Sequence, residues 1–144
     1  MAPLILAAMT SDDSAASVPR LTVTSVTIGA PDPRELAAFY ARLLRAEVTD
    51  TDPPRPGEPP EAGWAQVSSD VTLNFEWEPD YVAPTWPSVA GKQQIMEHLD
   101  VWVDDLDAAS AWAVEAGATL AEYQPQDDVR VFLDPAGHPF CLFL

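Results

Sequence analysis

His98 and Asp100 are the side chains best placed for chemistry, because they stand two positions apart in an alternating run. Alternate residues of a strand point to the same side, so both side chains face one way. The carboxylate could orient the imidazole, and His98 would then act as a catalytic general base. The strand rise puts their backbones roughly 6–7 Å apart, so direct contact is allowed but not implied. In the alternative interpretation, His98 anchors a polar surface by hydrogen bonding.

Cys141 is the single cysteine of the chain and a candidate nucleophile. Cys141 has an alternative role as a small buried hydrophobe, because nothing visible in the sequence activates its thiol.

Arg130 and His138 have different expected roles. The guanidinium of Arg130 is a cationic fork in a strongly acidic chain, and it could anchor a carboxylate or phosphate of a ligand. Its alternative is a salt bridge with Glu76 or Asp100. His138 follows a Pro-Ala-Gly turn, which favours a structural or exposed turn residue.

The strands that carry these residues have two different faces. One set of alternating positions is apolar throughout, which predicts packing beneath helices. The other set mixes aromatic, charged and amide side chains, as a small-molecule pocket requires. Alternatively, its aromatic residues pack a dimer interface. The predicted ligand-binding residues are Trp64, Gln66, Asn74, Glu76, His98, Asp100, Trp102, Arg130, Phe132, Cys141 and Phe143.

The order of elements predicts an α+β fold of two tandem βαβββ modules. In the first half, a strand over 21–29 precedes a helix that begins at Asp32-Pro33, with an N-cap acid and proline at the first helical position. Strands over 46–50, 64–68 and 71–77 follow. The second half repeats this order with a strand over 95–103, a helix over 105–116 and strands over 119–124, 129–133 and 139–144. We expect a curved, cup-like mixed sheet with both helices on its outer face.

The length of 144 residues fits one domain over residues 21–144, preceded by a flexible tail over 1–20. Module one covers about 21–78, a proline-containing linker about 79–94, and module two about 95–144. A net charge of −16 disfavours nucleic acid and anionic membranes as partners. The single cysteine allows no internal disulfide, and no apolar run approaches a membrane span. These features predict a cytoplasmic protein.

Several motifs together resemble the glyoxalase/bleomycin-resistance/extradiol-dioxygenase superfamily, also called vicinal oxygen chelate proteins. The nearest resemblance is to its glyoxalase-like branch, which is common in actinobacteria. It covers roughly residues 21–144. The matching segments are Asp32-Pro33 with Phe39-Tyr40, the connector Pro84-Thr85-Trp86-Pro87, His98-Leu99-Asp100-Val101 leading into Asp105-Leu106-Asp107-Ala108-Ala109, Gly117-Ala118, and the turn and strand from Asp134 to Leu142.

The resemblance implies a cup that binds a small molecule, but an incomplete metal site. Its metal enzymes carry ligands at the positions of Ser25, Asn74, His98 and Cys141, and only His98 is a typical ligand here. The resemblance thus implies no resident cofactor. The alternative is a divalent metal ion held by His98, Glu76 and Cys141, a set of about the three ligands required that would mix hard and soft donors. The expected function is therefore binding of an aromatic or heterocyclic molecule in a Trp- and Phe-lined cup, as in the drug-binding resistance members, with the homodimer as the family's usual assembly. The alternative is a lyase, isomerase or dioxygenase-type enzyme that uses His98 with a divergent metal or without one.

Overall fold

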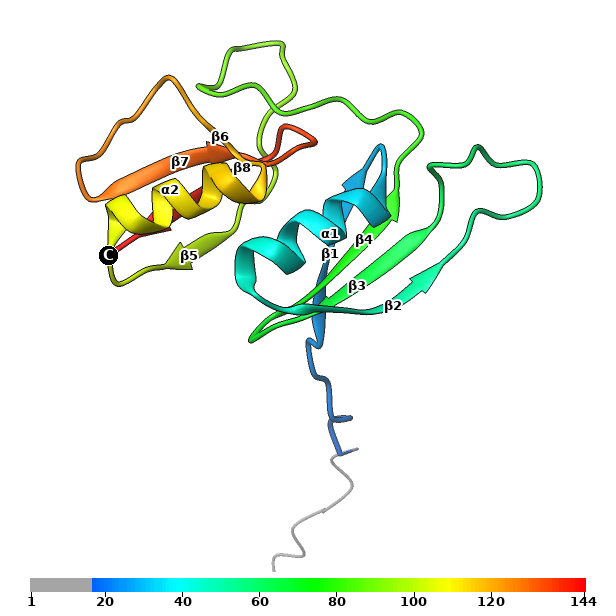
Figure 1. The fold of residues 1–144 in the computed structure, drawn as a ribbon. Helices are drawn as coiled ribbons and strands as arrows, with labels where there is room; N and C mark the ends of the chain where they lie inside the picture. Colours follow the sequence, from blue (N-terminus) through cyan, green and yellow to red (C-terminus); the bar gives the residue numbers. More distant parts are fainter. Residues whose placement is uncertain (1–16) are drawn as a thin grey trace, which may run out of the picture.

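The computed structural model describes residues 17–144, and Figure 1 shows its two α+β modules side by side. Residues 1–16 of the predicted tail lie outside this range. The first strand begins at Ser25 rather than at residue 21, and residues 17–24 form no helix or strand.

Module one forms a four-stranded mixed sheet with the strand order β1-β4-β3-β2. Its first strand runs parallel to its last, and the remaining neighbours are antiparallel. The β2 strand has a bulge between Val48 and Asp50, and it is exposed along its whole length at the sheet edge. The elements are β1 (Ser25–Ala30), α1 (Pro33–Leu44), β2 (Glu47–Asp52), β3 (Trp64–Ser68) and β4 (Thr72–Trp77).

Module two repeats this topology with the strand order β5-β8-β7-β6. The repeat predicted from the sequence is confirmed, although the strands at both edges of its sheet, β5 and β6, are several residues shorter than expected. The β5 strand has only three residues, so His98 lies before the strand rather than within it. The elements are β5 (Asp100–Trp102), α2 (Leu106–Ala116), β6 (Thr119–Leu120), β7 (Val129–Leu133) and β8 (Pro139–Phe143).

Both helices begin at an aspartate cap, as their sequences predict. The Asp32 side chain accepts a hydrogen bond from the Glu35 backbone N–H at 3.1 Å, and Asp105 accepts one from Ala108 at 2.9 Å. These bonds satisfy backbone donors that the first helical turn leaves free. At its end, α2 turns through Gly117, whose φ of 121° favours glycine.

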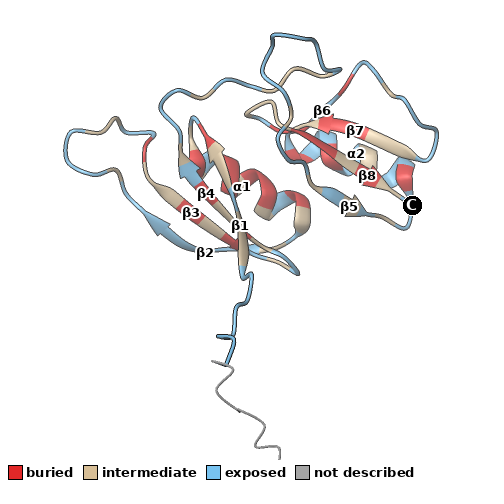
Figure 2. Cartoon of the chain, turned by 180° about the vertical axis from the view of Figure 1, so that it is seen from behind, coloured by how far each residue is buried: buried red, intermediate tan, exposed pale blue. Residues whose placement is uncertain are grey.

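One hydrophobic core joins the two modules on the helix side of the sheets. Figure 1 shows α1 and α2 on the same side, and the buried residues of Figure 2 gather on the helices and the central strands. Phe140 of module two lies 6.1 Å from Phe39 and 6.2 Å from Tyr40 of module one, measured between ring centroids. Arg42 and Trp112 add hydrogen bonds between the helices, because each donates to a backbone carbonyl of the other module.

The β7 strand faces the opposite way from the sequence prediction. Arg130 and Phe132 are expected in the cup, but Phe132 pairs with Phe140 and stacks on it at 5.9 Å inside the core. Arg130 pairs with Leu142 on the same face, whereas Val131 pairs with Cys141 on the other. A shift of one residue exchanges the two faces of a strand, and both faces of β7 carry apolar side chains. The placement of Arg130 and Phe132 in the cup is therefore wrong.

Candidate functional site

A row of three side chains crosses the sheet of module one on the side away from the helices. Strand register places Trp64 opposite Asp52 on one neighbour and opposite Glu76 on the other. The alternating residues Ala65 and Phe75 are fully buried in the core, so Trp64 and Glu76 point to the opposite face. Neighbouring strands lie about 4.8 Å apart, which brings both carboxylates beside the indole.

This row borders a cleft of about 480 Å³, here called the β2–β4 cleft. Its volume lies within the range of small-molecule sites. The loop over residues 53–63, which leaves β2 and returns to β3, forms its rim and is visible beyond the sheet in Figure 1. The lining side chains that matter for recognition are Asp50, Asp52, Arg55, Glu58, Trp64 and Glu76. Trp64 and Glu76 belong to the predicted set, whereas the four residues of β2 and its loop do not.

The adjoining row of the same face is occupied by hydrogen bonds within the protein. Gln66 donates to the Asn74 carbonyl oxygen at 2.9 Å, and the Asn74 amide donates to the Ser25 hydroxyl at 3.1 Å. Thr49 donates to Gln66 at 3.3 Å. The predicted ligand-binding side chains of Gln66 and Asn74 are thus hydrogen-bonded to each other, and Asn74 is also bonded to Ser25.

A second cluster lies on module two and consists of His98, Asp100 and Cys141. His98 Nε2 is 3.2 Å from Asp100 Oδ1, so the contact that the sequence only allowed is formed. Register places Asp100 directly opposite Cys141. One nitrogen, oxygen or sulfur atom from each of the three residues lies within 4.8 Å of the others. Together they offer the three donors that an open metal site requires.

The Cys141 thiol is held in its protonated form. Burial, the negative charge of Asp100 and a hydrogen bond to that carboxylate raise the pKa of Cys141. Because the thiolate is the reactive form, this environment makes Cys141 a poor nucleophile near neutral pH.

The remaining predicted residues are dispersed. Trp102 is 66% exposed and pairs with Phe143 in the row beyond Asp100 and Cys141. Arg130 donates to the backbone carbonyls of Asp127 and Val129 instead of forming a salt bridge with Glu76 or Asp100. Glu76 borders the β2–β4 cleft, so it does not join His98 and Cys141. Within residues 17–144, Asp100 takes the place predicted for Glu76 in the group of potential metal ligands.

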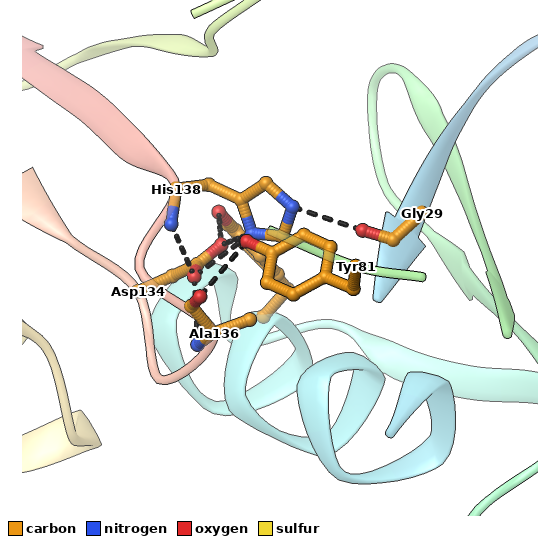
Figure 3. A network of polar contacts seen from close by, with 6 residues as sticks. Gly29, Tyr81, Asp134, Ala136 and His138 are labelled. Carbon is orange, nitrogen blue, oxygen red and sulfur yellow. Dashed lines mark hydrogen bonds and ion pairs between the residues drawn. The ribbon is translucent and has the colours of Figure 1, made fainter. Parts of the chain in front are cut away.

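A network around Asp134 is a polar centre that the sequence analysis did not identify as such. The Asp134 carboxylate, which is 4% exposed, accepts hydrogen bonds from the Tyr40 hydroxyl at 2.8 Å and from the backbone of Ala136 and His138. His138 Nδ1 lies 2.8 Å from the same carboxylate, and its Nε2 lies 2.9 Å from the Gly29 carbonyl, as Figure 3 shows. The sequence predicted a turn from Asp134 to His138, but it gave no sign that Asp134 would contact Tyr40 or that His138 would contact Gly29.

An apolar cavity of about 460 Å³ lies at the seam between the modules. It is bordered by Val26 and Ile28 of β1 and by His98 and Leu99 before β5. Tyr40 and His138 also reach it, but both are engaged in the Asp134 network. The cavity therefore presents fewer free polar groups than the β2–β4 cleft.

Known structures share this fold at low sequence identity. A glyoxalase family protein from Enterococcus faecalis has a TM-score of 0.62 and 22% identity over 85% of this chain and 97% of its own. The fosfomycin resistance protein FosX from Mesorhizobium loti has a TM-score of 0.61 and 12% identity, covering 85% and 90%. A FosX variant from Listeria monocytogenes, complexed with Mn(II) and 1S,2S-dihydroxypropylphosphonic acid, has a TM-score of 0.60 and 12% identity, covering 85% and 88%.

The sequence itself identifies the family. No curated protein is significantly similar to the chain. The family model described as the glyoxalase-like domain, however, matches residues 25–143, which span both βαβββ modules and both side-chain clusters. The chain belongs to the family of glyoxalase-like domains.

Proposed function

We propose that this protein binds a small aromatic or heterocyclic molecule in the β2–β4 cleft. The observation that carries the proposal is the partly buried indole of Trp64 in a cleft of about 480 Å³, with charged side chains around it. An indole offers a flat apolar surface on which a ring can stack, and the neighbouring polar groups orient the ligand. The sequence predicted a site lined by residues of both modules, whereas this proposal places the ligand against module one alone.

The test combines a search for a ligand with removal of the indole. Native mass spectrometry of the purified chain should detect a co-purifying small molecule, and Trp64→Ala should lose it. The matched control is Trp102→Ala, which removes an exposed indole from module two and should retain the ligand. The proposal fails if nothing co-purifies and if a set of aromatic and heterocyclic compounds leaves the NMR signal of the Trp64 indole unchanged.

The full metal set of the superfamily does not fit this chain. The positions that correspond to metal ligands in module one are Ser25 and Asn74, which are poor ligands and are hydrogen-bonded to each other at 3.1 Å. In module two the corresponding positions hold His98 and Cys141, and Asp100 lies beside them. The side chains at these positions therefore do not support a reaction that needs metal ligands from both modules.

The second candidate function is an enzyme centred on His98, Asp100 and Cys141. The close approach of their donor atoms favours it, since nitrogen, oxygen and sulfur ligands with open positions suit zinc. An ion held by these three residues would act as a Lewis acid at its open positions. Metal analysis after purification without chelators tests this candidate. It predicts near-stoichiometric metal that His98→Ala removes, and it fails if the metal content is negligible after incubation with excess zinc.

Three further expectations stay predictions: membership of the actinobacterial branch, a cytoplasmic location and a homodimer. Within residues 17–144, no helix has the length and apolar character needed to cross a bilayer. Sedimentation of the full chain tests the homodimer, which would appear as a species of twice the monomer mass.

A further inference from the structure

We propose that the β2–β4 cleft selects organic cations, with an ammonium or protonated heterocycle held over Trp64 between Asp52 and Glu76. This inference rests on the proposed small-molecule binding and names the chemical class of the ligand. It differs from the sequence expectation, in which Arg130 would have favoured an anionic ligand.

The position of the two carboxylates relative to the indole is the first argument. Asp52 and Glu76 are the direct cross-strand partners of Trp64, one on each side. A cation above the indole would thus be attracted by the ring face and by a negative charge at either flank. Strand pairing fixes this arrangement, because all three residues lie on the regular part of the sheet.

The second argument is that these carboxylates are free to meet a ligand. Within residues 17–144, neither Asp52 nor Glu76 has a side-chain hydrogen bond or an ion pair with the protein. The neighbouring row differs, because Gln66 and Asn74 are bonded to each other at 2.9 Å. The same face therefore contains one row that is satisfied internally and one row that leaves its negative charges without a partner.

The charge of the whole lining points the same way. Four carboxylates and one guanidinium, that of Arg55, border the cleft. Glu58 accepts a hydrogen bond from the Arg55 backbone N–H at 2.8 Å. This bond holds the loop and does not involve the Arg55 guanidinium. A cleft lined mainly by one sign of charge concentrates ligands of the opposite sign.

The geometry favours an extended organic cation over a metal ion. Within residues 17–144, the acidic residues of the cleft do not bring three donor atoms together, and only His98, Asp100 and Cys141 do so. Strand spacing separates the backbones of Asp52 and Glu76 by roughly 10 Å, with the Trp64 indole between them. Charges spread around an aromatic surface match a ring or alkyl group that carries a positive charge.

Three ligands of one size and different charge test this inference: benzylammonium, benzyl alcohol and benzoate. The readout is the indole Nε1–H NMR signal of Trp64 in the full chain, assigned through its loss in Trp64→Phe. We expect benzylammonium to bind about tenfold more tightly than benzyl alcohol at low salt, and benzoate to bind more weakly than either.

Variants locate the source of the selectivity. Asp52→Asn and Glu76→Gln should each reduce the ratio of benzylammonium affinity to benzyl alcohol affinity several-fold, because each removes one of the two charges beside Trp64. Glu122→Gln removes the same charge from an exposed loop residue of module two and should have no effect. Added salt should reduce the preference as it screens the carboxylates.

Two outcomes overturn the inference. If benzyl alcohol perturbs the Trp64 signal as strongly as benzylammonium, charge selection is absent while small-molecule binding in the cleft stands. If no member of the series perturbs that signal, the cation inference fails, and the co-purification experiment decides the binding proposal separately.

Discussion

At the scale of single residues, Asp134 shows how a buried charge is accommodated in this fold. A carboxylate withdrawn from water destabilises a protein unless hydrogen bonds replace its hydration. Asp134 meets this need with donors from Tyr40, Ala136 and His138. Both ring nitrogens of His138 lie within hydrogen-bond distance of an oxygen atom, one of the Asp134 carboxylate and one of the Gly29 carbonyl. His138 thereby links the last turn of module two to β1 of module one.

Tyr40→Phe should lower the free energy of unfolding by about 1–3 kcal/mol. The phenyl ring keeps its stacking on Phe75 at 5.4 Å, but Asp134 loses the hydrogen bond from the Tyr40 hydroxyl. Urea denaturation measures the change. Tyr123→Phe is the control, because Tyr123 is 50% exposed and its hydroxyl is not part of this network, and it should cost under about 0.5 kcal/mol. Equal effects of the two variants would contradict the assigned role of Asp134.

Tyr40 and Tyr81 should also make the fold sensitive to alkali. Burial and then the negative charge of Asp134 raise the pKa of both hydroxyls, and a hydrogen bond to Asp134 adds to the effect on Tyr40. Their folded pKa lies above the unfolded value of about 10, so their contribution is complete below pH 10. Above that pH the unfolded chain ionises first, and stability falls.

The measurement is the urea midpoint of unfolding between pH 9 and pH 11, compared with the same series for the variant that carries both Tyr40→Phe and Tyr81→Phe. The wild-type midpoint should fall more steeply above pH 10 than that of the double variant. Parallel curves would show that these two hydroxyls ionise alike in the folded and unfolded chain.

At the scale of elements, the return from the 53–63 loop into β3 depends on Gly63. Its φ of +128° is strained for any side chain, and an added Cβ would lie 2.4 Å from the Asp52 carbonyl oxygen. The same backbone carries Asp52, which flanks Trp64 in the cleft. A side chain at position 63 would therefore displace the backbone of Asp52 and change its position beside Trp64.

Gly63→Ala should destabilise the protein by about 1–3 kcal/mol and weaken benzylammonium binding, because the backbone of Asp52 must move away from the new methyl group. Gly57→Ala is the matched control: Gly57 also has a positive φ, +90°, but an added Cβ meets nothing within 4 Å. We expect a cost of about 1 kcal/mol or less there and unchanged binding. Denaturation and the Trp64 NMR titration provide the two readouts, and equal effects on binding would refute the contact with Asp52.

The orientation of β7 could not be predicted from the alternation of its own residues. Alternation predicted the faces of β3 and β4 correctly, because their polar and apolar residues separate cleanly. In β7 both alternating sets contain large apolar side chains, so the pattern allowed either orientation. Pairing with β8 decides the matter by placing Phe132 against Phe140. Burying a phenylalanine removes more apolar surface from water than burying a valine.

At the scale of the whole molecule, the two modules share one hydrophobic core. Phe140 is fully buried and lies between aromatic rings of both modules. Hydrogen bonds from Arg42 to the Ala116 carbonyl and from Trp112 to the Leu43 carbonyl join the helices. Because these contacts join the two modules, we expect the modules to unfold together.

Phe140→Ala should therefore reduce the stability of both modules together, by about 3–5 kcal/mol. The indole NMR signals of Trp64 in module one and Trp112 in module two should report the same urea midpoint in the wild type and in the variant. Val82→Ala, at a site that is 62% exposed, is the control and should change the midpoint little. A midpoint for Trp64 that Phe140→Ala leaves unchanged would show that module one unfolds independently.

The sequence by itself determined the elements and their repeated order. Aspartate caps, proline at the start of α1, glycine after α2 and the alternation of β3, β4 and β8 are signals between residues close in the chain. The same signals located Trp64 and Glu76 on one face and identified His98 as a candidate ligand. Local sterics and the periodicity of side chains suffice for such predictions.

Only the tertiary structure decided which side chains meet. Strand pairing brought Asp52 to Trp64, put Asp100 rather than Glu76 beside Cys141, and turned Arg130 and Phe132 away from the cup. Packing between modules brought His138 to Gly29. These contacts depend on the register of separate segments and on burial of the largest apolar surfaces, which are properties of the folded chain as a whole.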